Sequence, residues 1–317
     1  MTVWTYWAAA LLAAQPATPV DIPLAEAASL PDPEPAASTY DDEIVAGETD
    51  YYERMTVPVT IEGKGPFRFM IDTGAQATVV TRGLTEQLDL QPIGSATLIA
   101  MGSSRPVQLF ELNGLEFAQR VFDDISAPML EARHVGADGI LGLDSLQDLR
   151  VMIDFRDDSI AVNDSAALGG NRGFEIIVRA RQKLGRLIIT SAKIDGVSTA
   201  VVLDTGAQSS FGNSALRRRL RARNSEETTS TDVNGVATTG YRHYTKTLQI
   251  QEMQLNNLPI TFAESPVFAA LGLAEKPALI LGMRDLRLFD RVAIDFASRM
   301  VLFDLPRGSR LGGNTQG

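Results

Sequence analysis

The sequence predicts a mainly β protein with two lobes related by a pseudo-twofold axis, each carrying one short helix. Three observations predict this. The stretches FMIDTGAQATVV (residues 69–80) and VVLDTGAQSSFG (residues 201–212) both run from an apolar strand into Asp-Thr-Gly-Ala. Their flanking residues also match, and each copy later repeats an apolar-apolar-Gly motif, GILGLD or LILGMR. Two large copies favour two lobes over a solenoid, which needs several short units.

The strands before each DTGA follow from a shared pattern. VTIEGKGPFRFMIDTGA and SAKIDGVSTAVVLDTGA each read as a strand, a turn containing Gly and a second apolar strand that ends at the Asp. The helix follows from leucine spacing. Leu84 and Leu88 in the first copy, and Leu216 and Leu220 in the second, are four residues apart on polar segments, which indicates a one-sided helix.

The repeats divide the 317-residue chain, which is 44% hydrophobic and 21% charged. We expect an N-terminal lobe over 52–162, a linker over 163–173, a C-terminal lobe over 174–306 and a flexible tail over 307–317. Residues 21–51 are rich in Pro, Ala and acid, and read as a disordered acidic linker. The net charge of −10 argues against nucleic-acid or anionic-membrane partners.

Residues 1–20 read as a signal peptide or another apolar N-terminal segment. The apolar run from Val3 to Ala14 is shorter than the roughly 20 residues that span a bilayer, so no integral membrane domain is expected. The run suits export to the periplasm or beyond. No Lys or Arg precedes it, which leaves open a packed N-terminal element.

Asp72 and Asp204 become the candidate catalytic pair if the two copies face each other across the axis. Carboxylates about 3 Å apart share one proton, because two full charges there repel by roughly 5 kcal/mol. Such a pair is a base and an acid in one place, able to activate water for attack on a peptide carbonyl. This chemistry needs no metal, cofactor or covalent intermediate, and the chain contains no cysteine.

The neighbouring residues suit this task. Glycine lets backbone N–H groups approach the carboxylates, threonine offers a hydroxyl that can bond across the axis, and alanine packs beneath without donating a hydrogen bond to the carboxylate. The supporting residues are Thr73, Gly74, Ala75, Thr205, Gly206 and Ala207. Because Ala cannot lower the carboxylate pKa, we expect activity from mildly acidic toward neutral pH.

These motifs resemble those of the aspartic peptidases. The DTGA form and the short copies are similar to bacterial retropepsin-like proteases, and two linked copies resemble the bilobal pepsin layout. The resemblance covers about 52–306 and implies a retropepsin-like fold in each lobe, a catalytic dyad of Asp72 and Asp204, and a peptide substrate. It also implies β-hairpin flaps, with candidate tips at Met101–Arg105 and Asp232–Gly240.

Two alternatives to a monomeric protease stay open. A protein with this fold can bind peptides without cutting them, although the chain retains both Asp, both Thr and both Gly of the two motifs. A second molecule can also supply the partner for Asp72. Two complete copies in one chain favour a monomer with an intramolecular dyad.

Other conspicuous residues receive structural interpretations. His134 and His243 occupy non-equivalent positions in the two copies and make neither a triad nor a zinc site. Asp154 and Asp295, in MIDF and AIDF, are expected to make structural hydrogen bonds. The basic run Arg217–Arg223 is expected to be a solvated face, with docking of an acidic segment as the alternative.

Overall fold

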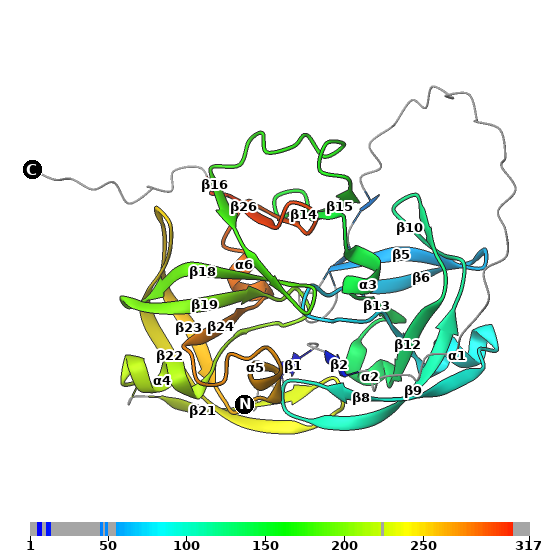
Figure 1. The fold of residues 1–317 in the computed structure, drawn as a ribbon, viewed down its shortest axis with the longest axis horizontal. Coiled ribbons are helices and arrows are strands. Elements are labelled where there is room, and N and C mark those ends of the chain that lie inside the picture. The colour runs from blue at the N-terminus through cyan, green and yellow to red at the C-terminus, as the bar shows by residue number, and fades with distance from the viewer. Residues whose placement is uncertain are drawn as a thin grey trace, which may run out of the picture.

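The computed structural model describes residues 5–7, 11–13, 45–46, 48–49, 55–222 and 225–306. They form two β-rich lobes side by side, with a further sheet above both (Figure 1), which confirms the predicted fold class. The predicted segments 1–20 and 21–51 lie outside the described residues apart from four short strands, and the tail 307–317 lies outside them altogether.

In the described part of the chain, the N-terminal lobe is an eleven-stranded sheet in the order β11-β10-β5-β6-β13-β7-β12-β9-β8-β2, with β4 beside β5. The strands are β2 (Leu11–Ala13), β4 (Glu48–Thr49), β5 (Met55–Ile61), β6 (Lys64–Ile71), β7 (Val79–Thr81), β8 (Pro92–Ile99), β9 (Ser104–Leu112), β10 (Leu115–Phe117), β11 (Arg120–Phe122), β12 (Ile125–Leu130) and β13 (Gly139–Leu141). The helices are α1 (Arg82–Leu88), α2 (Ala132–Val135) and α3 (Leu143–Leu146).

The C-terminal lobe repeats this plan in a nine-stranded sheet, in the order β1-β21-β22-β23-β20-β24-β19-β18-β17 among the described strands. The strands are β1 (Thr5–Trp7), β17 (Arg181–Lys183), β18 (Arg186–Ile194), β19 (Val197–Leu203), β20 (Ser210–Gly212), β21 (Glu226–Asp232), β22 (Ala237–Ile250), β23 (Met253–Phe262) and β24 (Ala278–Leu281). The helices are α4 (Ser214–Leu220), α5 (Pro266–Ala270) and α6 (Met283–Leu286).

The predicted helices are α1 and α4, and each copy adds two short helices that the leucine spacing did not indicate. Leu84, Leu88 and Leu216 are buried as predicted. Leu220 is only half-buried, at the edge of the core. Helix α4 is capped by the Asn213 side chain, which accepts a hydrogen bond from the Leu216 N–H at 2.9 Å.

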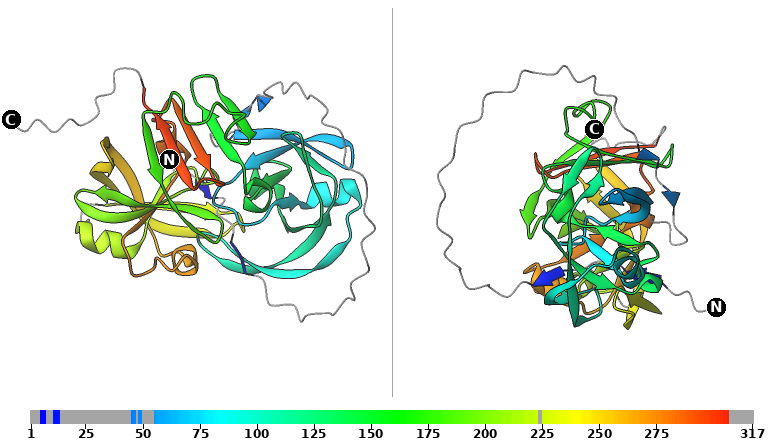
Figure 2. Two further views of the ribbon diagram at one scale, coloured as in Figure 1. Left: turned by 45° about the horizontal axis from the view of Figure 1, so that its top comes forward. Right: turned by 90° about the vertical axis from the view of Figure 1, so that its right-hand side faces the viewer.

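A six-stranded antiparallel sheet joins the lobes, in the order β16-β26-β25-β14-β15-β3 (Figure 2). Its strands are β3 (Val45–Ala46), β14 (Arg150–Asp154), β15 (Ser159–Asn163), β16 (Ile176–Arg179), β25 (Arg291–Asp295) and β26 (Met300–Asp304). The two central strands are the repeated RVMID and RVAID segments, one from each copy, paired so that Met152 is opposite Ala293. Backbone hydrogen bonds between two equivalent strands thus connect the copies directly, as a pseudo-twofold axis between these strands would require.

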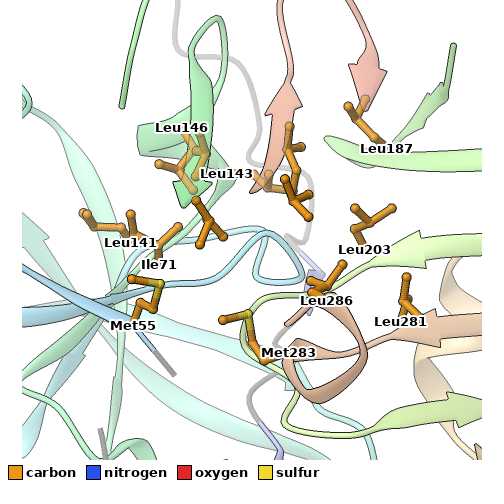
Figure 3. Close-up of a cluster of buried hydrophobic side chains, with 14 of the residues drawn as sticks. Met55, Ile71, Leu141, Leu143, Leu146, Leu187, Leu203, Leu281, Met283 and Leu286 are labelled. Carbon is orange, nitrogen blue, oxygen red and sulfur yellow. The ribbon is translucent and has the colours of Figure 1, made fainter. Parts of the chain in front are cut away.

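One hydrophobic core runs through both lobes beneath this sheet. Figure 3 shows Leu143 and Leu146 of the first copy in the same cluster as Met283 and Leu286 of the second. Burial of apolar surface at about 25 cal/mol per Å² is the main stabilising contribution of such a cluster. Because the cluster is shared, the lobes hold each other in a fixed orientation, and that orientation sets the geometry at their junction.

The backbones of β1 and β2 lie between the lobes (Figure 1). Residues 5–7 pair in parallel with β21, and residues 11–13 pair antiparallel with β8. Extended chain from the N-terminal region therefore adds a strand to a hairpin of each lobe.

Candidate active site

Asp72 and Asp204 stand where two equivalent strands end. Asp72 follows β6 and Asp204 follows β19, and each of these strands pairs in parallel with the apolar-apolar-Gly strand of its own copy, β13 or β24. The Asp72 N–H donates to the Leu141 carbonyl at 3.1 Å and the Asp204 N–H to the Leu281 carbonyl at 3.0 Å. Beyond this bond the chain leaves each strand and turns into the DTGA loop.

The two loops meet at the lobe junction, where both carboxyls are buried, at 0% and 1% exposure. Oδ1 of Asp72 accepts from the Gly74 and Ala75 N–H groups at 2.7 and 3.0 Å. Oδ1 of Asp204 accepts from Gly206 and Ala207 at 3.0 Å each. A side chain at Gly74 would overlap the Asp204 carboxyl, so glycine is required there by the close approach of that carboxyl.

The threonines bind the loops to each other. The Thr73 hydroxyl donates to the Leu203 carbonyl at 3.1 Å and accepts from the Thr205 N–H at 3.2 Å. The Thr205 hydroxyl donates to the Ile71 carbonyl at 2.7 Å and accepts from the Thr73 N–H at 3.0 Å. Four reciprocal hydrogen bonds thus hold the loops in register across the axis. Ala75 and Ala207 are fully buried beneath them.

The apolar-apolar-Gly motifs support the loops from behind through a second set of hydroxyls. The Gly142 N–H donates to the Thr78 hydroxyl at 3.2 Å, and the Gly282 N–H donates to the Ser210 hydroxyl at 3.1 Å. A Cβ at Gly142 would overlap the backbone of Ala77 and Thr78, just after the first DTGA, and a Cβ at Gly282 would overlap the backbone of Ala207 and Ser209 at the second. Close packing of backbone on backbone is therefore the physical reason for the glycine of this motif.

Burial and mutual repulsion change the acidity of the pair. Desolvation, followed by the charge of Asp204, raises the pKa of Asp72 well above its usual value. Desolvation also raises the pKa of Asp204, to about 6, although the charge of Arg186 and several hydrogen bonds oppose the rise. The two carboxyls lie next to each other, since Gly74 contacts both, and Oδ2 of Asp72 receives no N–H or O–H from the described residues. One proton held between the carboxyls satisfies this arrangement.

The two predicted flap segments are hairpin tips, and they meet over the junction. Met101 lies between β8 and β9 and packs with Ala207 and Phe211 of the C-terminal lobe. Val233 lies between β21 and β22 and packs with Met70 and Ala75 of the N-terminal lobe. Each tip therefore inserts an apolar side chain into the opposite lobe.

Hydrogen bonds connect the tips as well. The Asp232 carboxylate accepts from the Ser103 hydroxyl at 2.6 Å and from the Gly102 N–H at 3.2 Å. The Asn234 side chain donates to the Ser103 hydroxyl at 2.8 Å. We call the Ser103, Asp232 and Asn234 group the flap latch. The joined hairpin tips pack against Ala75 and Ala207 of the two DTGA loops, and both carboxyls are buried.

The structural interpretation of the repeated acids Asp154 and Asp295 fits their contacts. The Arg150 guanidinium donates to Asp295 at 2.7 and 3.0 Å, with both side chains fully buried. Burial acts to raise the pKa of Asp295, but hydrogen bonds from Ser298 and Arg150 outweigh it and lower the pKa. Asp154 bonds Arg156 at the sheet edge.

The histidines and the basic run lie outside the dyad. His134 packs under the flap tip at Gly235, and burial lowers its pKa, while His243 stands beside the Phe262 ring. In the basic run, Arg218, Arg219 and Arg221 are exposed. This is consistent with the predicted solvated face; Arg223 lies outside the described residues.

Sequence reasoning missed the flap latch, the supporting hydroxyls and Arg186. The repeat held a signal for two of these. Ser210 occupies the position of Thr78, and Arg54, outside the described residues, precedes Asp72 by the same interval that separates Arg186 from Asp204. Gln76 and Gln208 are also equivalent. Each has a buried side-chain oxygen that accepts no hydrogen bond from the described residues.

Comparison with known families agrees with this geometry. A family model described as aspartyl protease matches residues 57–145 and again residues 190–284, together more than half of the chain. A search of curated proteins returns no match. Among the described residues, no helix has the length and apolar character needed to cross a membrane. The two matches coincide with the two DTGA copies, and the chain belongs to the retropepsin-like aspartyl protease family, a family of peptidases, with two copies in one polypeptide.

Proposed function

We propose that this protein is an aspartic endopeptidase whose catalytic dyad is Asp72 and Asp204 of the same chain. The observation that carries the proposal is the convergence of the two carboxyls on Gly74, in loops that the threonine bonds hold together across the axis. A dyad completed within one chain supports a monomeric enzyme. The apolar start of the sequence supports export as part of the same proposal.

Because burial raises both pKa values and the two acids are coupled, the pair carries one shared proton, and the two acids divide the roles of base and acid. We assign the base to Asp204, on which the charge of Arg186 acts more strongly than on Asp72, and the acid to Asp72. Water transfers a proton to Asp204 while its oxygen bonds the peptide carbonyl carbon, and Asp72 protonates the carbonyl oxygen. Asp204 then protonates the leaving nitrogen as the C–N bond breaks, and Asp72 recovers its proton from the intermediate hydroxyl.

The substrate is an extended polypeptide bound as a strand under the flaps. Extended segments at residues 5–7 and 11–13 already pair with β21 and β8, the strands that lead into the two flap tips. Main-chain pairing of this kind supplies affinity without demanding one side-chain sequence. Because the flap latch joins the two hairpins and both carboxyls are buried, the hairpins have to separate before a substrate reaches the carboxyls.

The test is cleavage of a diverse peptide pool, read by mass spectrometry from about pH 4 to about pH 8. Wild-type protein should cut, with the acid limb of kcat/KM near pH 6 because Asp204 has to be ionised. Asp72→Asn and Asp204→Asn should each abolish cutting, and Asp164→Asn, which changes an exposed acid, should not.

Three outcomes would contradict the proposal. A wild-type protein that retains peptides uncut, with Asp72→Asn binding equally well, would identify a peptide-binding module. Cutting that survives Asp204→Asn but not Asp72→Asn would indicate that two molecules each supply Asp72. Activity confined to below about pH 4, near the ordinary Asp pKa, would contradict the raised pKa values.

A further inference from the structure

We propose that Arg186 is a positioning residue for the dyad, acting on Asp72 through the peptide unit that joins Gly74 to Ala75. This role for Arg186 adds to the proposed function, and its effect on catalysis rests on that function. Arg186 opens β18 in the C-terminal lobe, and its side chain crosses the lobe junction to the DTGA loop of the N-terminal lobe.

Arg186 is one of the two largest fully buried side chains among the described residues, with 1% exposure. The hairpin that carries it is packed against the other lobe, since a Cβ at Gly185 would crowd Leu143 and Gln147 of the α3 region. The next residue, Leu187, points into the shared core near Leu203 (Figure 3). The backbone on both sides of Arg186 is therefore held in place, which orients its guanidinium.

A chain of hydrogen bonds leads from the guanidinium to the dyad. Nη2 of Arg186 donates to the Gly74 carbonyl oxygen. The N–H of the same peptide unit belongs to Ala75 and donates to Oδ1 of Asp72 at 3.0 Å. A cation on the carbonyl side polarises the peptide and strengthens its N–H as a donor. Arg186 thus fixes the direction of this donor, which holds Oδ1 of Asp72 in place and leaves Oδ2 of Asp72 available for the shared proton.

Arg186 also supplies the charge that a buried dyad requires. The charged groups that act on it are Asp204 first and Asp72 second. The Asp204 carboxyl lies against Gly74, so one glycine is in contact with the Asp and with the Arg. A dyad that carries one negative charge is then balanced by one buried positive charge, which favours the ionised state over the neutral one. Its position favours ionisation at Asp204.

The experiment compares Arg186→Gln, Arg186→Lys and the surface control Arg156→Gln, which removes one positive charge at the edge of the joining sheet. The first readout is titration of Asp carboxyl carbons by NMR, which requires no cleavage. The second is the pH profile of kcat/KM on a peptide cut by the wild type. Failure of the proposed function would remove the second readout and leave the first intact.

In Arg186→Gln, both dyad midpoints and the acid limb should move up by about one pH unit, because a nearby positive charge lowers a carboxyl pKa by about that much. Arg186→Lys should keep the midpoints, since it keeps the charge. It should shift the Ala75 amide proton upfield, since the guanidinium donor is replaced, and lower kcat several-fold. Arg156→Gln should leave the dyad midpoints and the pH profile unchanged.

Unchanged midpoints in Arg186→Gln, or equal shifts in the Gln and Lys variants, would overturn the proposal. If Arg186→Gln fails to fold, Arg186→Lys decides. Wild-type midpoints together with an upfield Ala75 amide support the role. A Lys variant with the wild-type Ala75 resonance, or with displaced midpoints, contradicts it.

Discussion

At the scale of single residues, the dyad is a pair of acids kept where ionisation is costly. Each Oδ1 already has two backbone donors, so the loops favour a charged oxygen at one position. Burial and repulsion oppose a second charge. Burying the two acids therefore lowers the stability of the fold and leaves them with a shared proton. Active sites generally show such a loss of stability.

The cost of burying these acids predicts that Asp204→Asn increases the stability of the fold in a pH-dependent way. A carboxyl whose pKa rises on folding from 3.8 to about 6 stabilises the fold only below the unfolded value, and that contribution is lost as pH rises through about 6. At pH 8 the free energy of unfolding of the variant, measured by urea unfolding, should exceed that of the wild type by up to about 3 kcal/mol. The difference should shrink as the pH falls toward about 4. A variant less stable than the wild type at pH 8 would contradict this, and Asp164→Asn serves as the control.

At the scale of elements, the two flap hairpins meet at the lobe junction that holds the Asp pair. Their tips exchange apolar side chains between lobes and are joined through the latch. Asp232 also shapes its own turn, because its Oδ1 accepts from the Asn234 and Val236 N–H groups. The latch is thus partly a charge-assisted bond to a carboxylate that also holds its own turn, and opening the latch breaks these bonds.

Ser103→Ala isolates the latch, because it removes the hydroxyl that bonds Asp232 and Asn234 and leaves the Asp232 turn in place. Losing a hydrogen bond to a charged group costs about 1.5 to 3 kcal/mol, so amide exchange at Gly102 and Gly235 should accelerate by about tenfold or more. The KM for peptides should fall as opening becomes easier. Ser104→Ala, at the exposed neighbouring residue, is the matched control, and equal exchange in both variants would rule out the latch.

At the scale of the whole molecule, the joining sheet and shared core set the angle between the lobes. The equivalent strands β14 and β25 pair with each other, and Arg150 and Asp295 form a fully buried ion pair across them. Arg150 also donates to the side chain of Asn171 at 2.9 Å and to the carbonyl of Gly170. The pair thereby ties both central strands to the segment that connects the lobes.

Arg150→Met should destabilise the whole protein strongly. It leaves the Asp295 carboxylate buried without its cation, which typically costs about 3 to 5 kcal/mol in the free energy of unfolding. The control is Arg82→Met, which breaks a surface pair with Glu131 and should cost less than about 1 kcal/mol. Urea unfolding at neutral pH measures both. Similar costs for the two variants would show that the buried pair does not hold the lobes together.

The amino-acid sequence alone was enough to predict the repeated unit, the strand that ends at each Asp, the one-sided helices and the chemistry that a DTGA pair can perform. These features are local or periodic. A single Asp-Thr-Gly could be an ordinary turn, but two copies with matching flanks argue against a chance match. The threonine bonds could also be anticipated, because a pseudo-twofold axis brings equal residues together.

The side chains that come from unrelated positions to surround the Asp pair could be identified only in the folded protein. Arg186 reaches Gly74 across the lobe junction, and Ser103 reaches Asp232 between hairpins of different lobes. No periodicity encodes these contacts, since they depend on the lobe angle set by the joining sheet and the shared core. The pKa values depend on the same packing, because burial and the distance between charges exist only in the folded chain.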